Sequence, residues 1–259
     1  MPEDRDSAHV VCVGCSGWNY AHWRHGVFYP ERWPPARWLP FYARHFDTVE
    51  LNSTFYRLPR TSAVARWVAE TPDAFVFAVK VSRYVTHVKR LADAGLHLPL
   101  LLERLEPLLH TPKLGPLLWQ LPPTFKRDDD RLAAALGAAP GELRHAFEFR
   151  HESWFAADVI ALLREHNAAL VIADRPEIAS FQTHDLTADF TFVRFHHGAR
   201  GRGGNYSESE LEEWVERVRR WSERGDVYAY FNNDWEGYAP RNAQRLRELL
   251  GSLVRAMPA

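Results

Sequence analysis

One pattern recurs along this sequence and limits its possible folds: a short apolar segment, then polar residues, then a helical pattern. Eight such apolar segments with strand character follow one another. Strands that alternate with helices form parallel sheets, and eight units predict a sheet that closes into a barrel. The predicted strands are 10–14, 48–54, 74–82, 115–121, 145–150, 168–174, 190–196 and 227–234. We therefore expect the α/β class and a closed (β/α)8 TIM-type barrel, with parallel strands inside and helices outside.

The helical patterns fill most of the gaps between these strands. The clearest begins with a capping box made by Ser207 and Glu210, followed by Leu211, Trp214 and Val218 at helical spacing. At 259 residues the chain is close to the ~250 typical of one such barrel, and no linker or repeat divides it. We expect one domain over residues 1–259 with a short flexible N-terminal tail at about 1–9. The predicted helices are 61–70, 98–109, 128–136, 156–166, 209–224 and 241–254.

The composition limits the surroundings and partners of the chain. Its net charge of −1 gives no general reason to expect a nucleic acid or a membrane surface as partner. The first eight residues are too polar for a signal peptide, and no segment approaches the ~20 apolar residues of a membrane span. Cys12 and Cys15 form a C-x-x-C motif, but residues three apart on a strand face opposite sides, so we expect two buried thiols. These observations predict a cytoplasmic protein without a membrane partner.

Alternation along the predicted strands brings charged and amide side chains into the barrel. In the fifth strand, Phe147 and Phe149 face the helices, which turns Glu148 and Arg150 inward. All the polar residues placed inside by this argument lie late in their strands, at the end of such barrels where chemistry takes place. The inward set is Glu50, Asn52, Lys80, Gln120, Glu148, Arg150, Asp174, Arg194, His196, Asn232 and Asp234, with Asn233 beside it.

Two interpretations of this set remain open. It is either an ion-pair network that fixes the geometry of the barrel mouth, or a functional site, since the desolvation of so many charged groups is a large cost for stability alone. In the second interpretation Glu148 and Asp174 are general acid or base, and His196 is able to titrate. Arg150 and Arg194 bind an anionic group, and Lys80 is catalytic, either beside that anion or as a Schiff-base amine.

A divalent metal is an alternative for the same residues. Carboxylates and an imidazole suit Mn²⁺, Mg²⁺ or Zn²⁺. The three inward cations oppose a divalent ion, however, and no metal-binding motif is present. We therefore expect no cofactor and no metal ligands. The alternative ligand set is Glu50, Glu148, Asp174, His196 and Asp234.

The loops after the strands add candidates for the rim of the site. Residues 197–205 are rich in glycine and arginine and follow the seventh strand, where barrels of this type often bind phosphate, although a surface turn is equally consistent. Trp18 and Tyr20 follow the first strand and suit stacking on a ring, although packing is the alternative. Arg83, in a basic segment after the third strand, extends the predicted binding site.

Several motifs together resemble one family over nearly the whole chain. They include Gly14-Cys-Ser-Gly-Trp-Asn-Tyr20, Thr48-Val-Glu-Leu-Asn-Ser-Thr-Phe-Tyr-Arg57, Glu148-Phe-Arg-His-Glu-Ser-Trp154 and Phe231-Asn-Asn-Asp234. This set is similar to the YecE-like family, a bacterial and archaeal group with a domain of unknown function. The resemblance implies a closed TIM barrel and no established activity. The 198–205 loop is a local departure from the family pattern, so a phosphate role there is the claim that the resemblance supports least.

We therefore expect an enzyme that acts by acid/base chemistry at the C-terminal barrel mouth. Its substrate is a polar anion such as a sugar phosphate, a nucleotide or a nucleic-acid end. A metal-dependent phosphodiesterase or isomerase is one alternative, and a nucleic-acid or nucleotide binder without turnover is the other. The sequence does not predict an oligomeric state.

Overall fold

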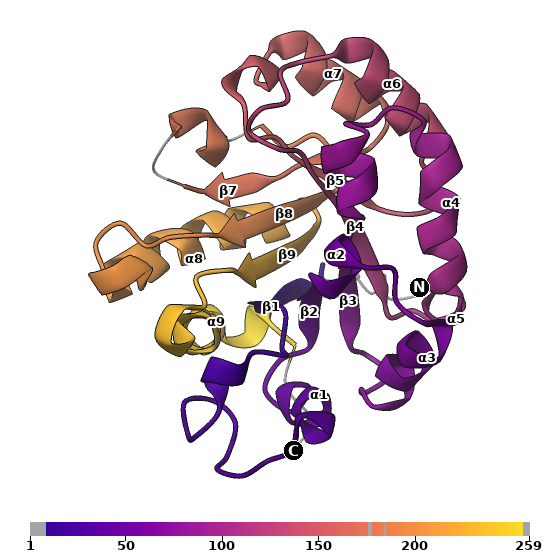
Figure 1. Ribbon diagram of the computed structural model, residues 1–259. Coiled ribbons are helices and arrows are strands. Elements are labelled where there is room, and N and C mark those ends of the chain that lie inside the picture. Colours follow the sequence, from indigo (N-terminus) through magenta and orange to yellow (C-terminus); the bar gives the residue numbers. More distant parts are fainter. Residues whose placement is uncertain (1–8, 176–177, 184, 256–259) are drawn as a thin grey trace, which may run out of the picture.

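A computed structural model describes residues 9–175, 178–183 and 185–255. Within these residues, nine strands form one parallel sheet in the order β6-β5-β4-β3-β2-β1-β9-β8-β7. The sheet curls into a nearly closed barrel at the centre of the molecule, and helices surround it (Figure 1). The predicted fold class is confirmed. The predicted N-terminal tail lies, apart from residue 9, outside the described residues.

The strands are short and almost entirely buried, as expected for a parallel sheet covered by helices. β1 pairs with β2 on one side and with β9 on the other, so the two ends of the described chain meet in the sheet. The strands are β1 (Val11–Ser16), β2 (Thr48–Leu51), β3 (Val76–Lys80), β4 (Leu114–Gln120), β5 (His145–Glu148), β6 (Ala169–Leu170), β7 (Ile172–Asp174), β8 (Phe190–Phe195) and β9 (Asp226–Phe231).

The predicted sixth strand is divided into β6 and β7. β6 pairs with β5 and β7 pairs with β8, while Val171 between them donates its backbone N–H to Phe147 O at 2.9 Å. The chain itself therefore joins the two edges of the sheet at this point. The eight predicted units are present, with nine strand segments in the described residues because one unit is split.

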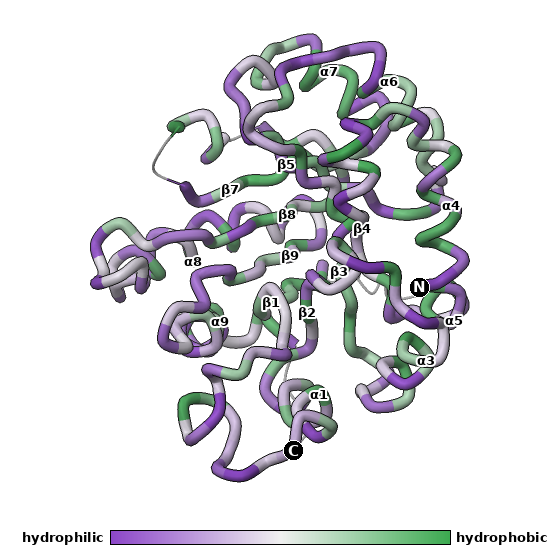
Figure 2. The backbone as a smooth tube through the Cα atoms, in the orientation of Figure 1, coloured by the Kyte–Doolittle hydropathy of each residue, from purple (hydrophilic) through white to green (hydrophobic). Residues whose placement is uncertain are grey.

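Hydrophobic and hydrophilic residues alternate along the outer helices (Figure 2). The predicted capping box is confirmed at the start of α8, where Ser207 and Glu210 bond reciprocally. The helices are α1 (Trp38–Tyr42), α2 (Ser53–Tyr56), α3 (Thr61–Ala69), α4 (Ala94–Arg104), α5 (Glu106–Leu109), α6 (Asp129–Ala138), α7 (Ala157–Glu165), α8 (Glu208–Ser222) and α9 (Tyr238–Leu250). No helix in the described chain is long and apolar enough to span a membrane.

The alternation of side chains separates two apolar clusters. The larger cluster lies between the strands and the helices and contains Cys15, Phe77 and Phe147. The smaller cluster fills the barrel interior with Cys12, Ala78, Ala146 and further residues. Cys12 and Cys15 are both free and buried and belong to different clusters, so the predicted separation of the two thiols is confirmed.

Candidate active site at the barrel mouth

The floor of the site is an ion network around Arg194, which β8 places inside the barrel. Arg194 is 1% exposed, and its Nε and Nη2 donate to Glu50 Oε2 and Oε1, both at 2.8 Å. Its Nη1 donates to Glu148 Oε2 at 2.6 Å. Both carboxylates are completely buried. The guanidinium thus joins strands β2, β5 and β8 through charge-assisted hydrogen bonds, which are the stronger kind.

Two further donors bond to the carboxylate of Glu148. Gln120 Nε2 donates to Oε2 at 2.9 Å and Arg150 Nε to Oε1 at 2.9 Å. Burial alone raises the pKa of this carboxyl, but Arg150 and Arg194 hold the pKa of Glu148 well below its usual range. Glu148 therefore stays ionised and fully bonded, and it is poorly suited to the acid/base role predicted for it.

His196 is also held in place rather than free to titrate. Burial lowers the pKa of His196 to about 4, so the ring is neutral near pH 7. Its Nε2 lies 3.3 Å from Glu148 Oε1, and its Nδ1 lies 3.1 Å from Asn232 Nδ2. These partners favour the tautomer in which Nε2–H donates to the carboxylate and Nδ1 accepts from the amide. His196 therefore orients Glu148 and Asn232.

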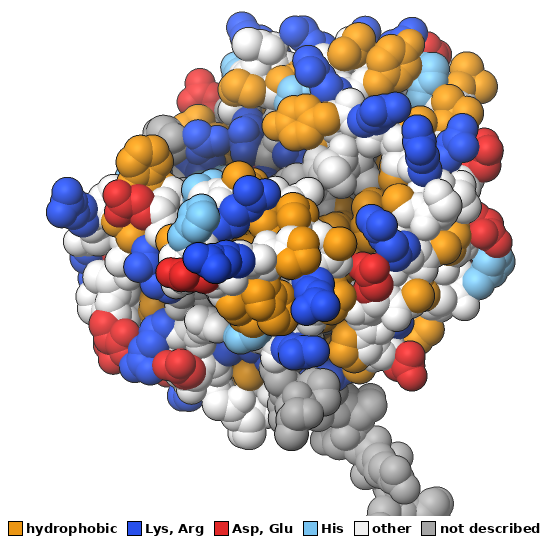
Figure 3. Space-filling view, turned by 60° about the horizontal axis from the view of Figure 1, so that its bottom comes forward, with side chains coloured by type: hydrophobic (Ala, Val, Ile, Leu, Met, Phe, Trp, Pro, Cys, Tyr) orange, Lys and Arg blue, Asp and Glu red, His pale blue; other side chains and the backbone are white. Residues whose placement is uncertain are grey.

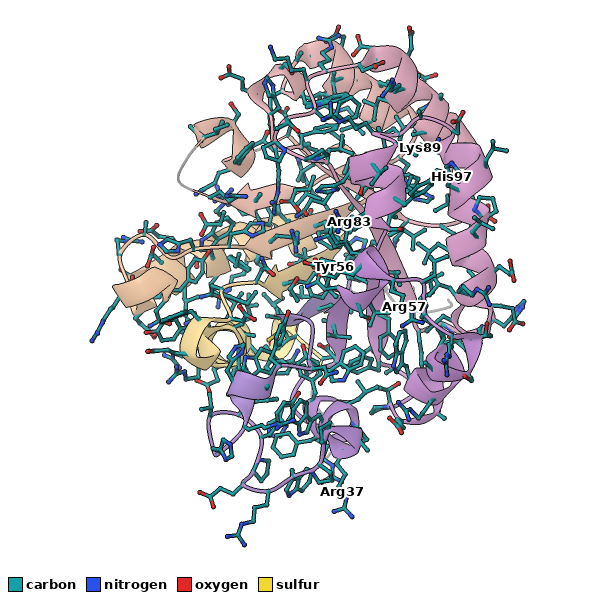
Figure 4. The ribbon with its side chains drawn as sticks, in the orientation of Figure 1. Arg37, Tyr56, Arg57, Arg83, Lys89 and His97 are labelled. Carbon is teal, nitrogen blue, oxygen red and sulfur yellow. The ribbon has the colours of Figure 1, made fainter. Side chains whose placement is uncertain are left out.

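A cavity of about 600 Å³ opens above this network. Figure 4 shows the labelled Tyr56 and Arg83 near one another at the centre of the view, and both line the cavity. Cationic side chains outnumber acids on its walls: among the described residues, Asp234 is the one carboxylate that lines it. The lining residues are Tyr20, Asn52, Phe55, Tyr56, Lys80, Arg83, His87, Gln120, Arg150, Arg194, Asn232 and Asp234.

Lys80 stands out among these cations. It ends β3 inside the barrel and is 8% exposed, and its Nζ lies 4.2 Å from the centre of the Phe55 ring. Within the described chain, no carboxylate or other acceptor forms a hydrogen bond with this Nζ. Burial and then the charge of Arg194 lower the pKa of Lys80 to about 7. A large share of the amine is therefore neutral at physiological pH.

The segment after β3 has unusual backbone geometry. It forms a π-helical turn at Tyr84–Val88, and Arg90, Leu91 and Asp93 follow with φ values of 49°, 65° and 55°. Residues other than glycine rarely adopt such φ angles, and π-helical turns are frequent at functional sites. This turn places His87 against Phe55, with ring centres 4.9 Å apart, on the cavity wall beside Lys80.

One predicted site residue faces the opposite way. Asp174 pairs in register with Phe195, which packs toward the helices, and its Oδ1 accepts a hydrogen bond of 2.5 Å from Gln182 Nε2. The preceding residue Ala173 is the one in register with Arg194. The inward orientation predicted for Asp174 is wrong, because it shares the helix-facing side with Leu170 and Ile172.

Two further predicted residues lie beside the cavity rather than on its wall. Asn233 is 6% exposed and donates to Gly204 O and Asn242 Oδ1, both at 2.9 Å, so it anchors the 198–205 loop to α9. Trp18 lines a neighbouring cavity of about 620 Å³. Tyr20, Asn52 and Tyr56 line both cavities. Asn52 Nδ2 donates to Ser16 O at 3.0 Å, which fixes this dividing wall.

Two backbone N–H groups of the 198–205 loop already have an acceptor within the chain. The backbone N–H groups of Ala199 and Arg200 donate to Glu210 Oε1 at 2.7 and 3.0 Å. Arg200 itself pairs with Glu213 at 2.8 Å. Glu210 and Glu213 thus neutralise Arg200 and take two of the loop amides, whereas the phosphate role predicted for the glycine amides stays a prediction.

The alternative metal site lacks its ligand cluster. Among the described residues, no group of three or more His, Cys, Asp or Glu side chains is placed to hold a metal ion. Glu50 and Glu148 give their oxygens to Arg194, and Asp174 faces the helices. This donor set does not fit a divalent ion.

Sequence reasoning missed the contribution of Ser16. Its hydroxyl donates to Glu50 and accepts from Arg194 Nη2 at 3.1 Å. The signal was alternation with Cys12 and Gly14, but the predicted first strand ended two residues too early. Phe55, Tyr56 and His87, which follow the second and third predicted strands, also line the cavity.

Comparisons with known proteins agree on one relationship. The family model described as "Protein of unknown function DUF72" matches residues 12–259. The UPF0759 protein YunF of Bacillus subtilis is 26% identical, covering 93% of this chain and 95% of that protein. The UPF0759 protein YecE of Escherichia coli K12 is also 26% identical, over 96% and 97%.

Solved structures show the same relationship. The crystal structure of a DUF72 family protein from Thermotoga maritima is 32% identical, with a TM-score of 0.83 over 93% of this chain and 99% of that one. A DUF72 family protein from Enterococcus faecalis is 25% identical, with a TM-score of 0.76 over 93% and 98%.

Proposed function

The chain belongs to the DUF72 family of proteins of unknown function, and on that premise we propose that it is an enzyme acting on a small anionic substrate at the barrel mouth. The resemblance to YecE-like proteins predicted from the motifs is confirmed by the match to YecE itself. The proposal keeps the predicted acid/base chemistry and moves it from Glu148 and Asp174 to Lys80.

The observation that carries this proposal is the state of Lys80. A buried amine normally has a hydrogen-bond acceptor or a carboxylate partner, because an uncompensated ammonium is costly to bury. The Nζ of Lys80 has neither among the described residues, although it lines a cavity of about 600 Å³. An amine with a pKa of about 7 matches what a general base needs at neutral pH.

The surrounding groups suit an anion. Arg83 is exposed at the rim, and Arg150 uses its Nε for Glu148, which leaves its Nη groups without an acceptor in the described chain. Both side chains line the cavity and would bind a phosphate or carboxylate group there. Lys80 would remove a proton beside that group, and the guanidiniums would stabilise the negative charge that develops. This is the chemistry of an isomerase or a lyase.

Proton removal is testable without knowledge of the complete reaction. We would incubate the protein in D₂O with dihydroxyacetone phosphate and with ribose 5-phosphate, and follow loss of C–H signals by proton NMR. We expect exchange with the wild type and a decrease of at least about 100-fold in Lys80→Met. Lys126→Met removes an exposed lysine outside the cavity and should exchange like the wild type. Equal exchange by Lys80→Met and the wild type would refute the role of Lys80.

Anion binding has its own test. Titration calorimetry of the same sugar phosphates should show a dissociation constant about tenfold higher for Arg150→Gln than for the wild type, the effect of losing one charge-assisted hydrogen bond. Arg57→Gln is the matched control, because Arg57 lies exposed next to Tyr56 and does not line the cavity (Figure 4). The proposal fails if both substitutions weaken binding equally, since that would indicate only a general effect of charge.

A further inference from the structure

We propose that the Lys80 amine forms a covalent imine with an aldehyde or ketone that also carries an anionic group. This inference rests on the proposed function, because it requires the same anionic substrate in the same cavity. It goes further by assigning a covalent intermediate to the site and a carbonyl group to the substrate.

The geometry gives the amine an open approach. Lys80 ends β3 at the barrel mouth, where the strand delivers its side chain to the cavity rather than to the helices. The face of Phe55, 4.2 Å away, supports the amine on one side without accepting a conventional hydrogen bond. Its lone pair is therefore not used by an internal partner among the described residues, and a carbonyl carbon in the cavity is within its reach.

The charges around the amine favour this chemistry in two ways. Burial and then the positive charge of Arg194 disfavour protonation of Lys80 and keep part of the amine neutral, as nucleophilic attack requires. Arg83 and Arg150 line the same cavity and would bind the anionic group of the substrate. An attached carbonyl would then lie between the guanidiniums and the amine. Imine formation by a lysine amine requires neither a metal ion nor an organic cofactor.

Imine formation at Lys80 takes place in two stages, addition to the carbonyl group and loss of water. The Nζ lone pair forms a bond to the carbonyl carbon while the C=O π pair moves to oxygen. The amine loses a proton, the oxygen gains one, and a carbinolamine results. Loss of that hydroxyl with one further proton releases water and leaves the C=N bond of the imine. His87 lines the cavity with a ring kept neutral by burial, with a pKa of about 4, and can pass a proton between nitrogen and oxygen.

Borohydride reduction tests the proposal on the wild-type protein. We would incubate it with dihydroxyacetone phosphate, pyruvate or uncharged dihydroxyacetone, add sodium borohydride, and measure intact mass and peptide maps. The chain has only four lysines, Lys80, Lys89, Lys113 and Lys126, so the modified position is easily assigned. We expect one adduct per chain, with the mass of the probe less one oxygen atom, on Lys80 and with an anionic probe only. Lys80→Met should form none, and Lys126→Met should form it as the wild type does.

The outcomes separate this inference from the proposed function. Adducts with dihydroxyacetone phosphate or with pyruvate alone would support the imine and identify the anion as phosphate or carboxylate. Arg150-dependent binding of dihydroxyacetone phosphate without any adduct would overturn the imine and leave the proposed function in place. Adducts spread over Lys89, Lys113 and Lys126, or formed equally with uncharged dihydroxyacetone, would also overturn it. Absence of both binding and adducts would count against both proposals.

Discussion

Two buried lysines at opposite ends of the barrel have different surroundings. Lys113 precedes β4 at the N-terminal end of the strands and is 5% exposed, and Lys80 ends β3 at the mouth and is 8% exposed. Lys113 Nζ donates to Val68 O at 2.7 Å and to Thr71 O at 2.8 Å, at the C-terminal end of α3. Carbonyl groups there are natural partners of a cation. Lys80 has no comparable partner among the described residues.

Burial alone therefore does not identify a functional side chain. Lys113 is as buried as Lys80, but its hydrogen bonds explain its position completely as a support for the end of α3. Lys80 has its charge removed from water without a hydrogen-bond acceptor among the described residues, and the attraction of Glu50 and Glu148 offsets only part of this cost, since the pKa of Lys80 stays lowered. A buried cation that the structure leaves unpaired beside a cavity is better explained by a ligand. Stability measurements can therefore distinguish the two lysines.

The largest effect should come from the network beneath Lys80. Replacing Arg194 with Met leaves Glu50 buried without an ion-pair partner in the described chain, and leaves Glu148 with Arg150 alone. We expect a loss of about 3–5 kcal/mol in the free energy of unfolding, measured by urea denaturation. Adding Glu50→Gln to this variant removes the unpaired charge and should restore part of the loss. A loss below about 1 kcal/mol in the single variant would contradict the structural role assigned to Arg194.

Substitution of each lysine by Met tests the comparison directly. Lys113→Met leaves the carbonyls of Val68 and Thr71 without a donor, so we expect unfolding to become easier by about 1–3 kcal/mol. Lys80→Met removes an unpaired amine and keeps the apolar contact with Phe55, so its stability should equal or exceed that of the wild type, within about 1 kcal/mol. If urea denaturation shows that Lys80→Met loses more stability than Lys113→Met, the roles assigned to the two lysines are wrong.

The pH dependence of stability gives the smallest and most specific difference. The folded-state pKa of Lys80 is about 7, whereas an unfolded lysine titrates near 10.5, so the unfolded state binds more protons between these values. The cost of Lys80 is therefore fully present below about pH 7 and is relieved as the pH rises, by about 1.4 kcal/mol per pH unit at most.

The control for this effect is again Lys80→Met. Burial lowers the pKa of Lys113 too, so the wild type minus the variant isolates Lys80. We expect the stability of the wild type to rise relative to Lys80→Met between about pH 7 and about pH 10 in urea titrations. Parallel pH profiles for the two proteins would show that the Lys80 pKa is not lowered in the fold.

Much of this site was predictable because strand alternation is a strict geometric rule. Phe75, Phe77 and Val79 mark the helix-facing side of β3, so Lys80 had to face the interior. The same argument placed Glu50, Glu148 and Arg194 in the interior, and the structure brings them together. The barrel followed from eight alternating units, which leave few other arrangements of parallel strands.

The prediction failed for the strand in which inward and outward residues do not differ in polarity. Residues 168–173 are all apolar, so nothing in the sequence shows which side of that strand faces the helices, and Asp174 was assigned to the wrong side. The partners of the 198–205 loop were not predictable either. Glu210 serves both the capping box of α8 and the loop amides, and one sequence motif reveals only the first role.

The distribution of charged side chains on the surface bears on the alternative of a nucleic-acid binder. Figure 3 shows Lys and Arg side chains interspersed with hydrophobic and acidic ones on this face, without one continuous basic surface. A long nucleic acid normally requires such a surface. The alternative of a nucleic-acid binder thus gains no support from the face shown, and a small ligand in the cavity remains the better explanation of the basic residues.

The pairing of β1 with β9 affects how the chain is made as well as how it is held together. Val11 pairs with Val227 and Cys15 with Phe231, so one edge of β1 is covered only by the last strand of the described chain to be synthesised. Until residues 226–231 leave the ribosome, that edge exposes unpaired backbone groups, through which strands of different molecules associate. Contacts between such distant segments also form slowly. During most of its translation, a nascent chain therefore has an unpaired strand edge that can associate with other chains. A chaperone that shields β1 would raise the yield of folded barrel.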